Sequence, residues 1–253
     1  MFRNPLIFSF FLLLSLSTFV QSLADQSTGS ALNKADQDSR KISDARSVEV
    51  SDARISVRRL RVPRKARQLY EKALEAWGKH AGADAQQKVE QALQLDPSFP
   101  EALTLLGGMQ ATNQQWDAAE QSVRAALRSD PDYPPAYVIL AGVCNTQQRY
   151  DEAQEAAEHA LQAGAATWSV QYEIARALIG RERYENAVAI SDAALLSNHG
   201  TLMHLARAHA MLGLQKYPEA AAELRTYLRD DPEGEGSQDA RDLLEQLQSL
   251  VSR

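Results

Sequence analysis

The sequence predicts an all-α protein, a solenoid of stacked helix–turn–helix repeats that ends in a capping helix. Three observations indicate this class. The stretch QALQLDPSFPEALTLLGG at residues 91–108 is echoed by AALRSDPDYPPAYVILAG at residues 125–142. Small residues recur at the same period along most of the chain, and apolar residues keep a helical spacing between them. A fixed period of about 34 residues is typical of repeat architectures that pair two helices per unit.

The composition is that of an ordinary globular protein, with an uneven distribution of charge. The chain has 253 residues, of which 44% are hydrophobic and 24% are charged, and its formal net charge is −6. Its single cysteine, Cys144, excludes an intramolecular disulfide and a cysteine-based zinc site. Residues 1–67 contain 12 basic and 6 acidic residues, and residues 68–253 contain 15 basic and 27 acidic ones. The acidic body argues against binding to nucleic acid.

Residues 1–24 have the pattern of a secretory signal peptide. Arg3 precedes an apolar run from Leu6 to Val20, and the small residues Ser22 and Ala24 suit cleavage after Ala24. The run is shorter than the roughly 20 residues of a spanning helix. We therefore expect export to a periplasm or to the extracellular space. An uncleaved N-terminal membrane anchor is the alternative, and we expect no integral membrane span in the mature chain.

Two further segments precede the repeats. Residues 25–52 are polar and poor in apolar side chains, which predicts disorder. Residues 53–65 are predicted to form a basic, extended leader, with alternating apolar residues before Pro63. The leader could dock its apolar residues on the first helix, or lie in the groove of the repeats. It could also contact an anionic surface through five arginines: Arg54, Arg58, Arg59, Arg61 and Arg64.

Residues 66–234 divide into five units, at 66–99, 100–133, 134–167, 168–200 and 201–234. Small residues recur at position 8 of each unit, and also at positions 20 and 27 in most units. Two helices joined by a short turn approach closely only where their contact carries little bulk. Pro97, Pro131 and Pro232 stand where the second helix of a unit should end.

This pattern resembles the tetratricopeptide repeat, a helix–turn–helix unit of about 34 residues. The resemblance implies a right-handed superhelix. After the repeats, residues 237–252 place several leucines on one helical face. We expect this segment to be the capping helix, because the last repeat of a solenoid otherwise exposes an apolar side.

No motif in the sequence points to catalysis or to a bound cofactor. There is no phosphate-binding glycine loop, no nucleophile elbow and no pair of histidines with metal-ligand spacing. We therefore expect no catalytic residues, no metal site, no cofactor and no enzymatic activity.

The resemblance implies that the first helix of each unit lines a concave groove. The candidate partner-binding residues on this groove are Tyr70, Trp77, Glu101, Thr104, Val138, Asn145, Tyr172, Arg176 and His209. The expected occupant is a peptide or an amphipathic helix of another protein. The basic clamp of chaperone-binding relatives is largely missing, since Gly108 and Gly142 occupy two of its positions.

The predicted function is therefore that of an adaptor or assembly scaffold in the cell envelope or outside the cell. Two alternatives remain. One is a surface-associated structural protein that uses the basic leader and self-associates. The other is a non-catalytic accessory subunit of an envelope enzyme.

Overall fold

The computed structural model describes residues 62–165, 167–196, 200–234 and 236–251. The predicted signal peptide, the polar segment 25–52 and leader residues 53–61 lie outside the described residues. Within the described ranges every regular element is a helix. The helices are α2 (Arg64–Gly78), α3 (Gly82–Leu95), α4 (Pro100–Thr112), α5 (Trp116–Ser129), α6 (Pro134–Thr146), α7 (Tyr150–Gln162), α8 (Trp168–Gly180), α9 (Tyr184–Leu196), α10 (Thr201–Gly213), α11 (Tyr217–Asp230) and α12 (Ser237–Val251).

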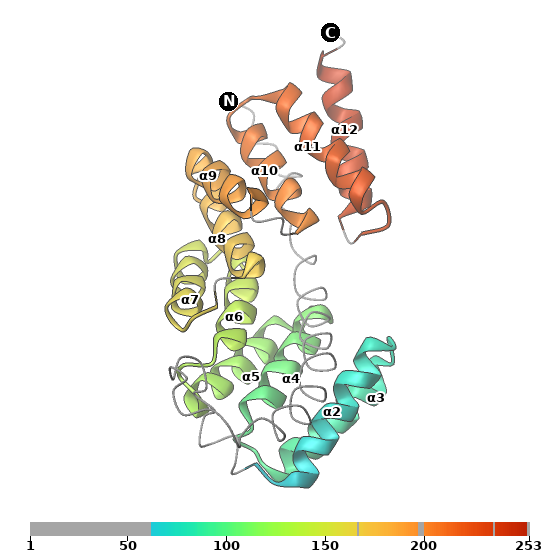
Figure 1. Cartoon of the computed structure of the whole chain (residues 1–253), viewed down its shortest axis with the longest axis vertical. Helices are drawn as coiled ribbons and strands as arrows, with labels where there is room; N and C mark the ends of the chain where they lie inside the picture. The colour runs from blue at the N-terminus through green and yellow to red at the C-terminus, as the bar shows by residue number, and fades with distance from the viewer. Residues whose placement is uncertain (1–61, 166, 197–199, 235, 252–253) are drawn as a thin grey trace, which may run out of the picture.

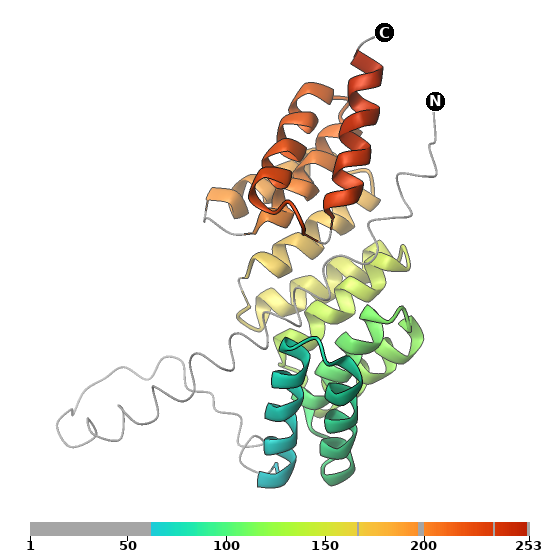
Figure 2. The same ribbon diagram turned by 90° about the vertical axis from the view of Figure 1, so that its right-hand side faces the viewer.

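The helices form five antiparallel pairs that stack into a solenoid, and α12 packs on the last pair (Figures 1 and 2). The first helices of successive pairs pack on one another: α4 on α6, α6 on α8, and α8 on α10. The second helices pack mainly on first helices instead, so the stack is tighter on the side of the first helices. We call the side formed by α4, α6, α8 and α10 the inner face, and the side formed by α5, α7 and α9 the outer face. The predicted fold class is confirmed.

Prolines and aspartates mark where one pair ends and the next begins. Pro100 and Pro134 occupy the first position of α4 and α6, where a missing N–H leaves no hydrogen bond unmade. Asp96 and Asp130 end the preceding helices in extended backbone. The carboxylate of Asp96 accepts a hydrogen bond from the backbone N–H of Ser98 at 3.0 Å, which holds the turn. The repeated Asp-Pro stretches therefore connect helix pairs.

The turn inside each pair has the same backbone in all five repeats. One residue of each turn adopts a left-handed conformation with φ of 59° or 60°: His80, Gln114, Gln148, Glu182 and Gln215. In the third repeat, the backbone N–H of Arg149 donates a hydrogen bond to the backbone carbonyl of Cys144 at 2.9 Å. The backbone N–H of Gln148 donates a hydrogen bond to the backbone carbonyl of Asn145 at 3.1 Å. This hydrogen-bond pair satisfies helix-terminal carbonyls and reverses the chain in three residues.

Small residues form the close contact between the two helices of a pair. Ala73, Ala141 and Ala175 are fully buried at position 8. Gly107 takes this position in the second repeat, and a Cβ there would overlap the side chain of Val123 on α5. The small residues read from the sequence therefore set the spacing of the helices.

The first helix begins slightly earlier than expected, and the C-terminal helix packs as the expected cap. Helix α2 begins at Arg64, within the segment expected to be an extended leader, and Pro63 is its N-cap. Val62 is buried beside it. At the other end, α12 buries Ala240 and Leu247 against the body, and the N–H of Gly236 donates to the hydroxyl of Tyr227 at 3.1 Å. These contacts fix the cap on the last repeat.

Candidate functional site

The inner face carries most of the candidate residues, and their side chains are mostly removed from solvent. Thr104 on α4, Val138 on α6 and Tyr172 on α8 are buried. Glu101 in the first turn of α4 is also buried. The sequence predicted a groove with partner-facing side chains. In the structure these side chains lie within a packed layer of the inner face.

A buried polar cluster occupies the centre of this face. The amide of Asn145 donates to the carboxylate of Glu173 at 2.8 Å and to its backbone carbonyl at 2.9 Å. The guanidinium of Arg176 donates to the same carboxylate at 2.9 Å and lies 5.8 Å from the centroid of the Tyr172 ring. The side chains of Arg176 and Glu173 are only 4% and 2% exposed. The structure thus brings together three predicted residues, Asn145, Tyr172 and Arg176, around a fourth that was not predicted.

Glu173 is the residue that sequence reasoning missed on this face. The resemblance to the tetratricopeptide repeat assigns certain repeat positions to the groove, and the position of Glu173 is not one of them. A signal was nevertheless present, because Glu173 precedes Arg176 by three residues on one helix, where opposite charges meet. The bond from Asn145 could not be read from the sequence, since it crosses between repeats over 28 residues. A buried ion pair of this kind needs such added hydrogen bonds to offset its desolvation.

Among the buried polar atoms of the inner face, two that form no hydrogen bond with the described residues bear on binding. They are the hydroxyl oxygen Oγ1 of Thr104 and the amide oxygen Oδ1 of Asn145. Buried polar atoms without partners are rare in native proteins, because each costs about 1–3 kcal/mol of stability. Both atoms can accept a hydrogen bond, and a neighbouring side chain has to move aside before a backbone N–H of a bound segment can reach them.

The other candidate residues lie apart from the cluster. The ring of Tyr70 packs against Phe99, with centroids 5.3 Å apart, so it contributes to the join between the first two repeats. Trp77 lies beside Gly82 at the turn from α2 to α3. His209 on α10 donates from Nδ1 to the carbonyl of Leu205 at 2.8 Å if that nitrogen carries the proton. Burial lowers the pKa of His209 to about 4, against the opposing effect of this hydrogen bond.

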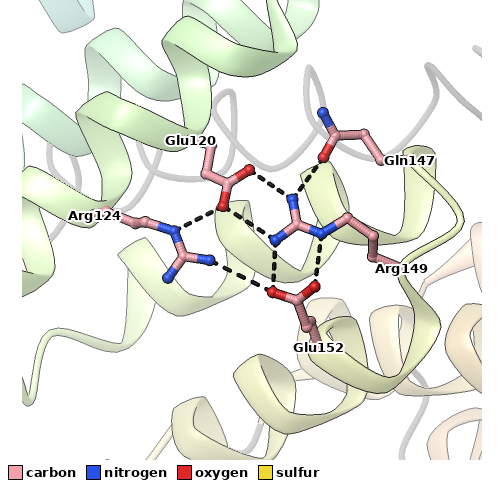
Figure 3. A network of polar contacts seen from close by, with 5 residues as sticks. All are labelled: Glu120, Arg124, Gln147, Arg149 and Glu152. Carbon is pink, nitrogen blue, oxygen red and sulfur yellow. Dashed lines mark hydrogen bonds and ion pairs between the residues drawn. The ribbon is translucent and has the colours of Figure 1, made fainter.

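The outer face carries a second polar network, which the sequence analysis did not identify (Figure 3). The guanidinium of Arg149 donates to Glu120 of the preceding repeat at 2.7 Å and to Glu152 of its own repeat at 2.7 Å. Arg124 donates to Glu120 at 2.7 Å and lies 3.6 Å from Glu152. The hydrogen bonds from Arg149 hold the pKa of both carboxyl groups below the usual value. This network joins the second and third repeats.

No metal or membrane site accompanies these networks in the part of the chain that the structure describes. No group of three acidic, histidine or cysteine side chains there is arranged to hold a metal ion. None of the helices in the described ranges has the length and apolar character that crossing a bilayer requires. Burial raises the pKa of the Cys144 thiol to about 11, so this cysteine is a poor nucleophile at neutral pH.

Comparison with known proteins agrees with this architecture. A family model of the tetratricopeptide repeat matches residues 70–134 and 146–200. No curated protein sequence matches the chain.

Several solved structures share the fold at low sequence identity. A tetratricopeptide repeat protein of Thermus thermophilus has a TM-score of 0.61 and 17% identity, covering 72% of this chain and 98% of its own. PilF of Pseudomonas aeruginosa has a TM-score of 0.59 and 18% identity, covering 75% and 91%. MamA of Desulfovibrio magneticus has a TM-score of 0.55 and 16% identity, covering 69% and 99%. From the repeated helix pairs, the shared turn geometry and the match of the family model, the solenoid of this chain is built from tetratricopeptide repeats.

Proposed function

We propose that this protein is an exported, non-catalytic adaptor that binds a peptide or an amphipathic helix of a partner protein on its inner face. The tetratricopeptide repeat fold suggests a scaffold for protein–protein interaction, because stacked repeats form an extended concave surface. The observation that carries the finer proposal is the pair of buried atoms, Thr104 Oγ1 and Asn145 Oδ1, that lack hydrogen-bond partners among the described residues.

The polar cluster supports this proposal by fixing the geometry of the inner face. Asn145 is held through its amide nitrogen by Glu173, so its oxygen has one defined direction. Glu173 is in turn held by Arg176. A preorganised acceptor costs little conformational entropy when a partner binds. The proposed role of the cluster is therefore to present Asn145 to the backbone of a bound segment.

Substitution of Thr104 by valine separates binding from stability. Valine has the shape of threonine without its hydroxyl, so Thr104→Val should leave the fold intact and raise the free energy of unfolding by about 1 kcal/mol. The same change should weaken partner binding. The partner would be identified by crosslinking in the native compartment, and affinity and thermal unfolding would then be measured with the chain that begins at Asp25.

Ser169→Ala on α8 is a suitable control, because the Ser169 hydroxyl already has a partner in Thr167, at 2.8 Å. It should not reproduce the combination of higher stability and weaker binding. Unchanged affinity in Thr104→Val would remove the hydroxyl of Thr104 from the proposed site.

The proposed export rests on the N-terminal sequence pattern. Expression of the whole chain with its native N-terminus, followed by mass determination of the product, tests it. The expected product begins near Asp25 and is found outside the cytosol. A cytosolic product that retains residues 1–24 would contradict this part of the proposal and leave the inner-face proposal standing.

A further inference from the structure

A cleft on the outer face separates α5 from α7 and is lined by α6 at its base. It has a volume of about 400 Å³, and side chains of α5, α6 and α7 line it, among them Ala156 on α7. Its origin is the curvature of the stack. First helices pack on one another, whereas α5 and α7 are held apart and both rest on α6. The cleft is therefore built into the fold between the second and third repeats.

The floor and the walls of the cleft differ in chemistry. Buried Leu140 and Cys144, with half-buried Tyr137, form an apolar floor on α6. The α5 wall carries the cations Arg124 and Arg128, and the α7 wall carries the carboxylates Glu152 and Glu155, which makes one wall basic and the other acidic. The ring of Tyr137 stacks on His159 of α7 at 5.1 Å between centroids.

At one end of the cleft, the charged side chains of the two walls pair with each other. Arg124 lies 3.6 Å from Glu152 across the cleft, and both belong to the network of Figure 3, which balances their charges. At the other end, Arg128 is exposed and forms no ion pair with any residue that the structure describes. On the opposite wall, His159, at 4.0 Å, is the single ion-pair partner of Glu155 among the residues that the structure describes. An uncompensated positive and an uncompensated negative charge thus face this end from opposite walls.

We propose that this cleft is a second docking site, which takes an amphipathic helix of a partner protein with an apolar stripe between one acidic and one basic flank. The apolar stripe would lie over Tyr137, Leu140 and Cys144, the acidic flank would face Arg128, and the basic flank would face Glu155. A helix seated between two parallel helices repeats the packing that α6 already makes with α5 and α7. A helix with two acidic flanks would place one of them against the acidic α7 wall, and a helix with two basic flanks would place one against the basic α5 wall. Either repulsion lowers the affinity.

This site is separate from the inner face and does not depend on the function proposed above. An adaptor with one site on each face can hold two partners at once, because the helix pairs lie between them. The two sites also differ in what they recognise. The inner face offers buried hydrogen-bond acceptors, whereas the outer cleft offers an apolar floor and two opposite charges.

A library of helix-forming peptides tests the proposal with the chain that begins at Asp25. Each peptide is about three to four turns long and carries a constant leucine and phenylalanine stripe. The flanking positions vary among Glu, Lys and Gln. We expect captured peptides to carry acid on one flank and base on the other. A helix can lie in the cleft in either direction, so the expected rule is opposite signs on the two flanks.

Three variants assign the captured peptides to the cleft. Ala156→Leu fills the cleft and should reduce capture by about tenfold. Arg128→Glu lies on the surface, so it keeps the fold and should shift the preference at one flank from Glu to Lys. Arg225→Glu on α11 makes the same change of charge on an exposed residue away from the cleft and should have no effect.

The proposal is overturned by any of three results: no peptide is captured, the captured peptides show no correlation between the signs of their flanks, or they bind Arg128→Glu as well as the unchanged chain. If Ala156→Leu does not fold, as judged by circular dichroism, Arg128→Glu decides alone. Capture that survives Arg128→Glu and is lost in Thr104→Val would assign the peptides to the inner face and reject the outer cleft.

Discussion

At the scale of single residues, the repeats are joined by tyrosines that fill spaces left by glycines. The ring of Tyr150 lies where a Cβ of Gly180 would be, and the ring of Tyr184 lies in the same way against Gly213. Burial raises the pKa of both tyrosines. Each pair connects the outer helix of one repeat to the inner helix of the next. The glycines near the ends of α8 and α10 are therefore required by a close approach.

Gly180→Ala tests this packing. Alanine normally stabilises a helix relative to glycine, but here its Cβ would overlap the ring of Tyr150. We expect the free energy of unfolding to fall by about 1–3 kcal/mol, as is usual for overpacking. Urea unfolding followed by circular dichroism measures the change. Gly82→Ala is the control, because the nearest atom to its added Cβ is 3.8 Å away, at ordinary contact distance. Equal stability of both variants would show that the Tyr150 ring moves aside freely.

The pKa of His209 links stability to pH. Burial lowers it to about 4, whereas an unfolded histidine has a pKa of about 6.5. Between these values the unfolded state binds more protons, so stability is lost as the pH falls through this window. From pH 7 to pH 5 the loss should be about 2 kcal/mol. His209→Gln should flatten this part of the pH profile in chemical unfolding.

At the scale of elements, the turn inside each helix pair depends on one left-handed residue. The sequence offers no glycine at any of the five positions, although glycine is the residue that this conformation favours. A non-glycine residue there costs about 1 kcal/mol. The turns are consequently held by the helices on either side of them.

Gln114→Gly should therefore stabilise the protein by up to about 1 kcal/mol, since it removes the strain of a left-handed side chain. Asn113→Gly is a matched control one residue earlier, where the backbone has φ of −85° and glycine brings only added freedom in the unfolded chain. The control should be neutral or destabilising. Thermal unfolding of the two variants beside the unchanged chain measures the difference, and a destabilised Gln114→Gly would contradict the account.

At the scale of the whole molecule, an arginine bridges each of three successive repeat boundaries on the outer side. Arg149 reaches Glu120 on α5, and Arg181 lies 3.1 Å from Asp151 on α7. Arg207 lies 2.7 Å from Asp192 on α9. In every case the arginine comes from the later repeat. Because nearest-neighbour contacts largely set the cooperativity of a solenoid, these bridges couple the repeats.

Arg149→Met tests the strongest of these bridges, shown in Figure 3. It keeps the length of the side chain and removes two carboxylate partners, so we expect a loss of about 1 kcal/mol that shrinks at high salt. A double-mutant cycle with Glu120→Gln measures the coupling between the two side chains. Arg183→Met is the control, at the equivalent place one repeat later, where Arg183 is exposed and forms no ion pair with the described residues. A zero coupling energy would make Arg149 a surface charge without structural effect.

The helix pairs were predictable because their signals are local. Proline at the start of a helix and aspartate at its end act within a few neighbouring residues, and a small residue at position 8 meets the other helix of its own pair. The candidate site was predictable only in part. Asn145 and Arg176 were found from their repeat positions, but Glu173 was not, because that position carries no signal in the repeat pattern.

The sequence by itself determined the period and the pairing of the helices, because these follow from residue size and backbone preference along one stretch of chain. Only the tertiary structure decided which polar groups meet. Asn145 and Glu173 are 28 residues apart, and Glu120 and Arg149 are 29 apart. Stacking brings residues about one repeat apart into contact, and the pairing among them depends on burial and side-chain reach, which no local pattern specifies. The outer cleft was likewise decided only by the tertiary structure, because the curvature of the stack holds α5 and α7 apart over the floor that α6 forms.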